Sequence, residues 1–444
     1  MKYFGTDGFR GEANKTLNAH QAFLVGLSFG QQCKELYRDG FIYIGKDTRI
    51  SSSMLEHALA AGLSSSGMDV KLLGVVPTPV VSYLTRSSEA VGAVMISASH
   101  NPYRDNGIKL FNHHGQKIAS STEQKIEQVI DQEVEVKLVD GDDIGSIESD
   151  FDAIQRYIDF LNKEVPLDLT GLKVVLDCAN GASISTAQKV FEKTGCELIV
   201  LFDTPDGKNI NVNCGSTHVD RLKEKVLELK ADVGFAFDGD ADRCIGVNHL
   251  GQEVDGDHMI YIYARYLKEK NDLNNNLVVT TVMANLGLFK ALDELGIETH
   301  KTAVGDKYVF EALKDYDGVI GGEQSGHIIF KKLANTGDGV LTALMMCHVM
   351  SEKNQSLARL SEDLTIYPQR LKNVEVVDKG SALENEQLKH KIESVNQLLG
   401  DKGRLLVRPS GTEPLVRVMV EAQSQELCDQ LVDEIIDVIH ANNL

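Results

Sequence analysis

The sequence predicts an α/β protein with three similar mixed α/β-sheet domains followed by a smaller C-terminal α+β domain. The chain has 444 residues, which at roughly 150 residues per domain suggests about three domains, with two or four also compatible. Three stretches repeat one pattern: a short β-branched run, a turn, a helix-like period and a second apolar run. Strands that alternate with helices of this length imply parallel sheets covered by helices on both faces.

The first repeat begins at the apolar run 41–44. Residues 46–49 (KDTR) lead into a serine-capped helix from about Ser51, which Gly67 ends, and residues 70–76 follow as a strand. The second repeat has a strand over 173–177, a helix up to Gly195 and a strand over 196–202. The third has a strand over 277–282, a helix up to Gly296 and a strand over 297–302.

The pattern changes after residue 368. A polar, helix-like stretch is followed by strands over 404–407 and 415–420 and by an amphipathic helix that ends near Ile439. This order predicts the smaller α+β domain. The expected domains are 1–150, 151–252, 253–368 and 369–444.

Composition excludes several classes of protein. Hydrophobic residues at 42% and charged residues at 25% are typical of a globular chain and exclude disorder, collagen and coiled coil. With 45 basic and 65 acidic residues the net charge is −20, which opposes binding to nucleic acid or to an anionic membrane. An anionic substrate would therefore need a few clustered Arg and Lys side chains.

Cysteine usage and the N-terminus predict a soluble, cytoplasmic protein. Seven cysteines without a CxxC pair argue against a disulfide framework or a zinc site, and we expect most of them in the core. The first residues contain no apolar leader segment, and no apolar run approaches about 18 residues.

The first candidate loop is 97–102 (SASHNP), directly after the apolar strand 91–96. We expect Ser99 on a tight, exposed turn, where its hydroxyl can act as a nucleophile or carry a phosphate. Alternatively, Ser99 or Asn101 only hydrogen-bonds its own backbone. Lys109 follows on the next strand.

The second candidate loop is 238–243 (DGDADR), between the apolar runs 232–237 and 244–247. Three carboxylates at alternate positions can converge on one hard cation such as Mg²⁺ or Ca²⁺. An EF-hand is excluded, because Arg243 stands where that loop needs glycine and His249 where it needs glutamate. A solvated acidic turn is the alternative.

The third and fourth candidate loops are 321–327 (GGEQSGH) and 408–414 (RPSGTEP). In the third, Glu323 and Ser325 can bind neighbouring hydroxyl or amino groups of a sugar, and His327 can move a proton near neutral pH, although a lone histidine is often structural. In the fourth, Arg408, two hydroxyls and backbone N–H groups suit a phosphate, with Arg417 nearby. Surface arginines on a structural loop are the alternative. The chain has no Walker A motif and no GxGxxG opening a helix, which removes support for kinase and dehydrogenase functions.

Four such loops in this order, one per predicted domain, describe phosphoryl transfer on a phosphosugar. Together with 4–11 (FGTDGFRG), 209–211 (NIN) and 214–218 (CGSTH), they resemble the α-D-phosphohexomutase superfamily. Segment 322–327 looks most like its bacterial phosphoglucosamine mutases. The resemblance covers nearly the whole chain. It implies four domains around a central cleft, and conversion of glucosamine 6-phosphate to α-glucosamine 1-phosphate on the route to UDP-N-acetylglucosamine and cell wall.

The resemblance also implies roles for individual residues. Ser99 would carry the phosphate, and one Mg²⁺ would be held by Asp238, Asp240, Asp242 and a phosphoserine oxygen. The substrate-binding positions are Glu323, Ser325, Lys307, Arg408, Ser410, Gly411, Thr412 and Arg417. The positions lining the reaction centre are Arg10, Lys109, Arg243 and His327, with Lys109 and His327 as candidates for proton transfer. Glucose or glucosamine 1,6-bisphosphate would be activator or intermediate, and a homodimer would suit the family.

Two residues depart from the subgroup, and two other functions compete. Phe9 stands where a small β-branched residue is usual, and Lys307 stands where arginine is usual, which loses bidentate geometry but keeps the charge. A phosphomannomutase or phosphoglucomutase would share every catalytic part. A non-catalytic sugar-phosphate sensor could dispense with Ser99, so retention of Ser99, the three aspartates and Lys109 argues against it.

Overall fold

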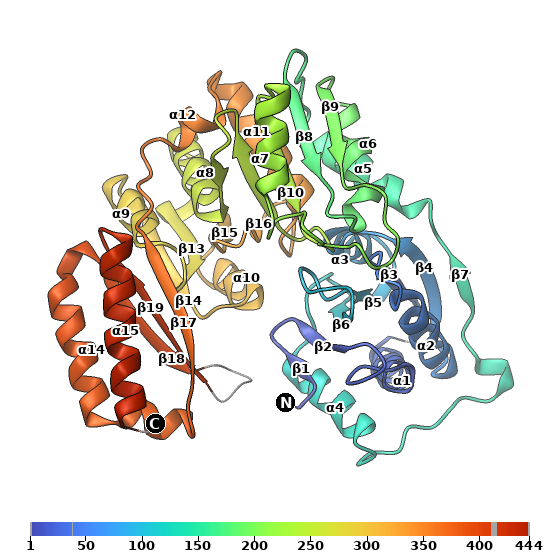
Figure 1. Ribbon diagram of the computed structural model, residues 1–444. Helices are drawn as coiled ribbons and strands as arrows, with labels where there is room; N and C mark the ends of the chain where they lie inside the picture. The colour runs from blue at the N-terminus through green and yellow to red at the C-terminus, as the bar shows by residue number, and fades with distance from the viewer. Residues whose placement is uncertain (1, 38, 410–414, 443–444) are drawn as a thin grey trace. The chain divides into compact units, whose positions relative to one another are not determined.

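The computed structural model describes residues 2–37, 39–409 and 415–442. The chain forms two compact units, the first comprising residues 1–283 and 297–362 and the second residues 284–296 and 363–444. Figure 1 shows the order of the elements along the chain. The described residues form sheets of seven, five, four and three strands, the last of them in the second unit.

The seven-stranded sheet comes first in the chain. Its strands are β1 (Phe4–Gly5), β2 (Gly8–Glu12), β3 (Phe41–Lys46), β4 (Asp69–Val75), β5 (Ala90–Ile96), β6 (Asp105–Asn112) and β7 (Ile147–Ser149). Its helices are α1 (Ala19–Leu36), α2 (Ser52–Ser65), α3 (Thr78–Arg86) and α4 (Ser120–Ile130), with the short turn η1 (Gly141–Asp143). Strand β5 is buried along its whole length, as expected for a strand covered on both faces.

The start of α2 differs from the expected serine cap. Ser51 occupies the cap position, but its side chain makes no capping hydrogen bond and accepts one from Asn106 Nδ2 at 2.8 Å instead. Asp47 takes the local role, since its Oδ1 accepts from Arg49 N at 3.0 Å and from Ser52 Oγ at 2.9 Å. Asp47 therefore fixes the turn before the helix, and α2 begins without a side-chain cap. The expected end of the helix is confirmed, because Gly67 follows it with φ +85°.

The five- and four-stranded sheets follow. The first of these regions contains α5 (Ala153–Glu164), β8 (Lys173–Asp177), η2 (Ala182–Ser185), α6 (Ala187–Glu192), β9 (Glu197–Leu201), α7 (Asp220–Leu229), β10 (Val233–Phe237), β11 (Cys244–Asn248) and β12 (Glu253–Val254). The other contains α8 (Gly256–Lys270), η3 (Asn274–Asn276), β13 (Leu277–Thr281), α9 (Leu286–Glu294), β14 (Glu298–Thr302), α10 (Asp306–Asp315), β15 (Ile320–Gly322), β16 (Ile328–Phe330), α11 (Gly339–Lys353) and α12 (Leu357–Ser361). Of these elements α9 belongs to the second compact unit.

The first three sheets contain the same strand order, which confirms the predicted repeat. The runs are β4-β3-β5-β6, β9-β8-β10-β11 and β14-β13-β15-β16. In each run the first three strands are parallel, and the fourth pairs antiparallel with the third. Each repeat thus combines the expected parallel strands with one antiparallel strand, because it ends in a hairpin whose connection is too short for a crossover helix, and the mixed α/β sheets are confirmed. The predicted loops 97–102, 238–243 and 321–327 lie at those three hairpin connections, and we call them the serine, aspartate and glutamate loops.

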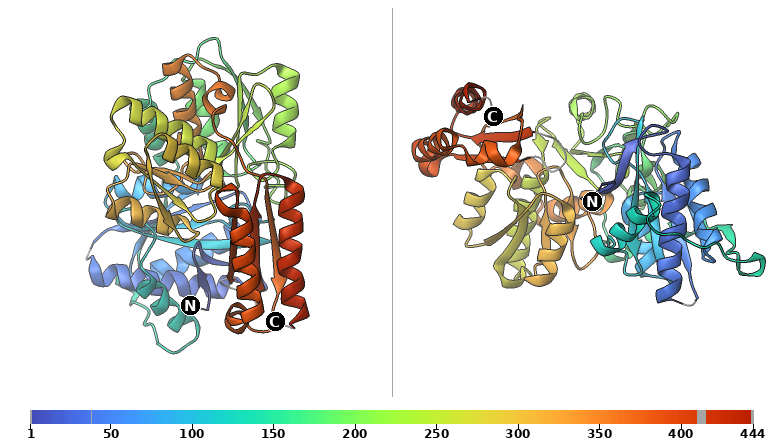
Figure 2. Two further views of the ribbon diagram at one scale, coloured as in Figure 1. Left: turned by 90° about the vertical axis from the view of Figure 1, so that its left-hand side faces the viewer. Right: turned by 90° about the horizontal axis from the view of Figure 1, so that it is seen from below.

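The second unit has its own small core. Its elements after α9 are β17 (Gln369–Glu375), α13 (Lys379–Glu384), α14 (Glu386–Leu399), η4 (Gly400–Lys402), β18 (Arg404–Pro409), β19 (Leu415–Glu421) and α15 (Gln425–Ala441). The strands are antiparallel in the order β17-β19-β18, and α14 and α15 lie side by side against them (Figure 2). Leu388, Val418 and Leu431 are among the side chains buried between these helices and the sheet. This arrangement confirms the smaller α+β domain.

Two further expectations concern the whole chain. All seven cysteines are free and six of them are buried, which confirms that they are mostly core residues. Within the described part of the chain, no helix is long and apolar enough to cross a membrane.

Candidate active site

Ser99 lies on the hairpin connection between β5 and β6, and it is fully buried. The expectation that it sits on an exposed turn was wrong, because Gly239 and Asn211 from the next sheet pack onto it. Ser99 Oγ donates to Asp238 Oδ2 at 2.5 Å. The hydroxyl therefore points into the aspartate loop, and His100 Nδ1 lies 3.3 Å from it. Burial and the nearby Arg243 lower the pKa of His100 to about 4, so that ring is neutral.

Asp238, Asp240 and Asp242 converge as the sequence predicts. All three are buried, and one oxygen of each lies within 4.8 Å of the others. Burial together with the charges of Asp242 and Asp240 raises the pKa of Asp238 to about 8. The Oδ1 atoms of Asp240 and Asp242 are buried and have no hydrogen-bond partner among the described residues. Buried carboxylate oxygens that accept no hydrogen bond, at this spacing, fit a hard divalent cation.

Lys109, on strand β6 after the serine loop, forms ion pairs with two of these carboxylates. Its buried ammonium lies 2.8 Å from Asp240 and 3.3 Å from both Asp242 and Asp7. Burial alone would lower the pKa of Lys109, but Asp240, Asp7 and Asp242 raise it well above the usual value. Lys109 is therefore a fixed positive charge in this arrangement.

Asp7, Lys117 and Asp306 join the site from outside the four loops, and none of them was predicted as a site residue. Lys117 Nζ donates to Asp7 and to Asp306, each at 2.7 Å, and Arg10 pairs with Asp7. Although burial opposes the charge, Lys109, Lys117 and Arg10 hold the pKa of Asp7 well below its usual range. A single Asp or Lys carries no spacing signal, so only the fold reveals this network.

Arg243 and His327 also approach the aspartates. Arg243 Nε is 3.8 Å from Asp242 Oδ1, and its backbone N–H donates to Asp238 Oδ1 at 3.2 Å. His327 Nδ1 lies 3.7 Å from Asp242 Oδ1, while Nε2 accepts from Gly337 N at 2.8 Å. Burial opposes a charge on this ring, but Asp242 and further carboxylates raise its pKa to about 9. The hydrogen bond from Gly337 N requires a lone pair on Nε2 and so opposes the charge that the carboxylates favour; while this bond is made, the ring proton lies on Nδ1, facing Asp242.

Segment 335–339 (NTGDG) was also missed; it donates hydrogen bonds to the aspartate loop and to His327. Besides the Gly337 bond to His327, Gly339 N donates to Ala241 O at 2.9 Å. A Cβ on Gly337 would lie 2.5 Å from Asp242 O, and one on Gly339 would lie 2.3 Å from Arg243 O. Two glycines that flank the N-cap aspartate of a helix were the available signal in the sequence.

Glu323 and Ser325 occupy the connection between β15 and β16. Glu323 Oε1 accepts from Gly305 N at 3.1 Å. Ser325 Oγ is buried and has no hydrogen-bond partner in the described chain. Both side chains are therefore on the same loop as His327, as predicted.

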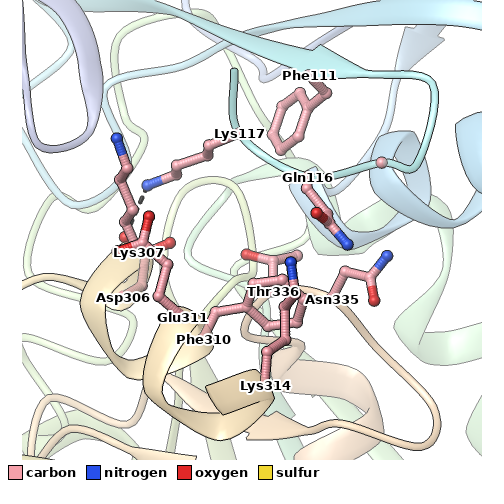
Figure 3. Close-up of a pocket in the computed structure, with 11 residues that line it drawn as sticks. Phe111, Gln116, Lys117, Asp306, Lys307, Phe310, Glu311, Lys314, Asn335 and Thr336 are labelled. Carbon is pink, nitrogen blue, oxygen red and sulfur yellow. Dashed lines mark hydrogen bonds and ion pairs between the residues drawn. The ribbon is translucent and has the colours of Figure 1, made fainter. Parts of the chain in front are cut away.

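Lys307 lies beside this group, on α10. Its amine donates to Ser120 Oγ at 3.2 Å, next to the Lys117–Asp306 pair (Figure 3). A cavity of about 90 Å³ adjoins these side chains. It is also lined by Phe111, Gly115, Gln116, Phe310, Glu311, Lys314, Asn335 and Thr336.

Arg408 and Arg417 are described in the second unit, whereas Ser410, Gly411 and Thr412 lie outside the described residues. The two arginines face each other across β18 and β19. Burial and the neighbouring Arg417 lower the pKa of Arg408. The Nε atoms of both are buried and lack a hydrogen-bond partner among the described residues. Two guanidinium groups held together in this way suit an anion.

Family models of known proteins match the chain in four consecutive segments. They are the phosphoglucomutase/phosphomannomutase α/β/α domain I at residues 1–137, domain II at 155–251 and domain III at 255–367, and the C-terminal domain at 371–438.

Curated and solved proteins agree with these models. A phosphoglucosamine mutase from Lachnospira eligens is 49% identical over 99% of this chain and 98% of its own. A phosphoglucomutase/phosphomannomutase family protein from Burkholderia thailandensis has a TM-score of 0.83 at 25% identity, covering 99% of this chain and 97% of that one. An Aspergillus fumigatus N-acetylphosphoglucosamine mutase, solved with GlcNAc-6P and magnesium, shares the fold with a TM-score of 0.73 at 17% identity, over 100% and 96%. The chain thus belongs to the phosphoglucomutase/phosphomannomutase family.

Proposed function

We propose that the chain interconverts glucosamine 6-phosphate and α-glucosamine 1-phosphate, the reaction of phosphoglucosamine mutases, with Ser99 carrying the transferred phosphoryl group. The observation that carries this proposal is the buried Ser99 hydroxyl, 2.5 Å from Asp238 and beside two further carboxylates and Lys109. The full-length relative that is 49% identical and bears this name supports the choice of sugar.

The site fits one Mg²⁺ per chain. Asp238, Asp240 and Asp242 would hold it, together with an oxygen of phosphorylated Ser99. The Oδ1 atoms of Asp240 and Asp242 support this assignment, because buried anionic oxygens that accept no hydrogen bond require compensation. When bound, the ion would neutralise charge on the phosphoryl oxygens.

Each half-reaction exchanges one P–O bond for another. A free sugar hydroxyl attacks the phosphorus on Ser99, the bond from phosphorus to Ser99 Oγ breaks, and a 1,6-bisphosphate forms. The bisphosphate then reorients, and its other phosphoryl group returns to Ser99. Lys109, Arg10 and Arg243 supply positive charge around the transferred group. In the first half-reaction the attacking hydroxyl loses a proton and Ser99 Oγ gains one. His327 is the candidate to move it, by accepting the proton on Nε2 in place of the Gly337 N–H and releasing the one held on Nδ1.

Recognition of the rest of the substrate is assigned to the remaining predicted residues. Glu323 and Ser325 would bind the sugar's hydroxyl and amino groups, and Lys307 would also contact the substrate. Arg408 and Arg417, with Ser410, Gly411 and Thr412, would hold the phosphate that does not react. This set must accept either end of the sugar, which suits a group of donors better than a pocket of fixed shape.

Phosphorus NMR tests the proposal directly. Protein with Mg²⁺ and a trace of glucose 1,6-bisphosphate is given glucosamine 6-phosphate, mannose 6-phosphate or glucose 6-phosphate in parallel. We expect fast conversion of the glucosamine ester, abolished in Ser99→Ala and retained in Ser66→Ala, a buried serine that bonds only its own helix. Melting curves of both variants confirm that they fold.

The other outcomes identify the competing functions. A preference for mannose or glucose would keep the mechanism and replace the sugar. No conversion of any sugar by phosphorylated protein would favour the non-catalytic sensor. The homodimer suggested by the resemblance stays a prediction, which sedimentation equilibrium checks.

A further inference from the structure

Two side chains from different loops donate hydrogen bonds to the same two backbone carbonyls of the serine loop. Arg49 Nη2, from the connection between β3 and α2, donates to Ser99 O at 3.0 Å and to Asn101 O at 2.6 Å. Asn211 Nδ2, from the loop after β9, donates to Ser99 O at 2.9 Å and to Asn101 O at 3.3 Å. We call this pair of donors the carbonyl clamp.

The backbone that the clamp holds is strained. Ser99 has φ +54°, a left-handed conformation that residues other than glycine rarely adopt. Such conformations persist where the surroundings over-determine them, and they are concentrated at active sites. The clamp therefore has a physical task, which is to keep Ser99 turned so that Oγ faces Asp238.

The Arg49 arm of the clamp is itself fixed. Arg49 is 2% exposed, and Asp47 neutralises it through a buried ion pair. Asp47 also accepts from Ser97 Oγ at 2.6 Å, and that oxygen in turn accepts from Ser99 N at 2.9 Å. Both the N–H and the carbonyl of Ser99 are thus tied to residues 47–49 (DTR).

The Asn211 arm comes from the sheet that carries the aspartates. Asn211 is 7% exposed, and its N–H donates to Ala179 O at 2.9 Å. Next to it, a Cβ on Gly239 would lie 2.5 Å from Ser99 O, so the aspartate loop touches the same carbonyl. The clamp thereby fixes the serine loop to the loop that faces it.

We propose that Arg49 and Asn211 are positioning residues for phosphoryl transfer, which act by holding the Ser99 and Asn101 carbonyls and not by touching substrate. The inference rests on the proposed function. Phosphoryl transfer depends on alignment of the attacking and leaving oxygens, and the clamp keeps Oγ in place while its phosphate leaves and returns.

Asn211→Ala is the sharpest test, because removing a neutral amide leaves no unpaired charge. Asn213→Ala is its matched control, since Asn213 is exposed, lies in the same loop and has φ +53° against +60° for Asn211. We expect kcat to fall about 10- to 100-fold in Asn211→Ala, with KM changed by less than about twofold, and neither to change in Asn213→Ala. Arg49→Lys keeps the charge opposite Asp47 and should retain part of the activity.

Hydrogen exchange of residues 97–101 gives a readout that needs no turnover. We expect it to be about tenfold faster in Asn211→Ala than in wild type and in Asn213→Ala. Equal exchange in the two variants, or an equal effect on kcat, would overturn the clamp. A wild type inert toward all three hexose phosphates would instead refute the proposed function, and exchange would still decide on the clamp.

Discussion

The positive charge of Lys109 offsets the repulsion among the buried carboxylates of the site. Its ammonium compensates Asp240, Asp242 and Asp7 at 2.8 to 3.3 Å, in a place where water contributes little. A divalent cation would compensate two of the same carboxylates. Under the proposed function, Lys109 and a bound Mg²⁺ would compete in electrostatic terms for these carboxylates while both would stabilise the phosphoryl group.

Replacing Lys109 should separate these two effects. We expect Lys109→Met to bind Mg²⁺ several-fold more tightly while kcat falls about 10²- to 10³-fold. Titration calorimetry and the NMR assay measure the two quantities on the same sample. Lys163→Met, at a side chain that is 82% exposed, should change neither. Weaker Mg²⁺ binding in Lys109→Met would contradict the proposed competition.

The aspartates should stabilise the fold through the metal. At about 100 times the dissociation constant, Mg²⁺ should raise the melting midpoint by about 3 °C. Asp240→Asn should lose this shift, and Asp220→Asn, at a side chain that is 93% exposed, should keep it. The measurement needs no turnover. A full shift in Asp240→Asn would remove that residue from the metal site.

At the scale of single elements, the N-terminus of α11 gives a pH dependence. Asp338 caps this helix by accepting from Leu341 N at 3.0 Å, and it also accepts from Tyr157 OH at 2.7 Å. Burial raises its pKa from 3.8 to about 6. The folded state therefore takes up a proton at higher pH than the unfolded chain does. From this group, stability rises as pH falls from about 6 to about 4, by roughly 3 kcal/mol at most.

Asp338→Asn should remove that dependence. The amide still caps the helix and can donate to Tyr157, but it carries no charge to bury. We expect the variant to be more stable than wild type by about 1–3 kcal/mol at pH 8 and equal to it near pH 4. Denaturant titrations across this range provide the check. A constant difference at all pH values would mean that Asp338 does not titrate as described.

The 335–339 loop should be intolerant of side chains. A Cβ on Gly337 would lie 2.5 Å from both Asp242 O and His327 Nε2, so Gly337→Ala must displace one of them. We expect kcat to fall at least about tenfold, with an altered pH profile because His327 loses its donor. Gly141→Ala, at a glycine with open space around it, should behave as wild type. Unchanged kinetics in Gly337→Ala would exclude this supporting role.

Element positions could be predicted from the sequence, but their pairing could not. The β-branched runs located β8 and β13 to within a residue, because local propensity and burial agree there. The antiparallel return of β6 onto β5 depends on contacts across the sheet, and its loop carries no hairpin signature that fixes direction. Ser99 was expected to be exposed for a related reason: the residues that bury it, such as Asn211, are far away in the sequence.

At the scale of the whole molecule, the repeats explain why so much of the site was predictable. Each of the first three sheets repeats one strand order and places its loop at the same hairpin, so three of the four predicted loops occupy equivalent positions. The partners Asp7, Lys117 and Asp306 lie outside the four loops, and none of them was predicted as a site residue, although Asp7 stands within the segment 4–11. The expected divisions at 150, 252 and 368 stay predictions.

The second compact unit includes a helix that the sequence places among the elements of the third sheet. The N-terminus of α9 is bound to later residues: Leu286 N donates to Glu421 Oε2 at 2.9 Å, and Asn285 Oδ1 accepts from Tyr367 N at 3.0 Å. Glu421 is fully buried and also pairs with Arg404 at 2.6 Å. This carboxylate therefore ties α9 to β18 and β19.

Glu421→Gln should loosen α9 together with the second unit. The substituted amide places a donor where the native oxygens accept from Leu286, Gln369 and Arg404, and one unmade buried hydrogen bond costs about 1–3 kcal/mol. We expect hydrogen exchange of residues 286–294 to accelerate about 10- to 100-fold, in proportion to that cost, with β8 in the first unit unchanged. Glu426→Gln, at an exposed position, should leave both unchanged. If exchange of α9 stayed at the wild-type rate in Glu421→Gln while β18 and β19 loosened, α9 would not share the stability of the second unit.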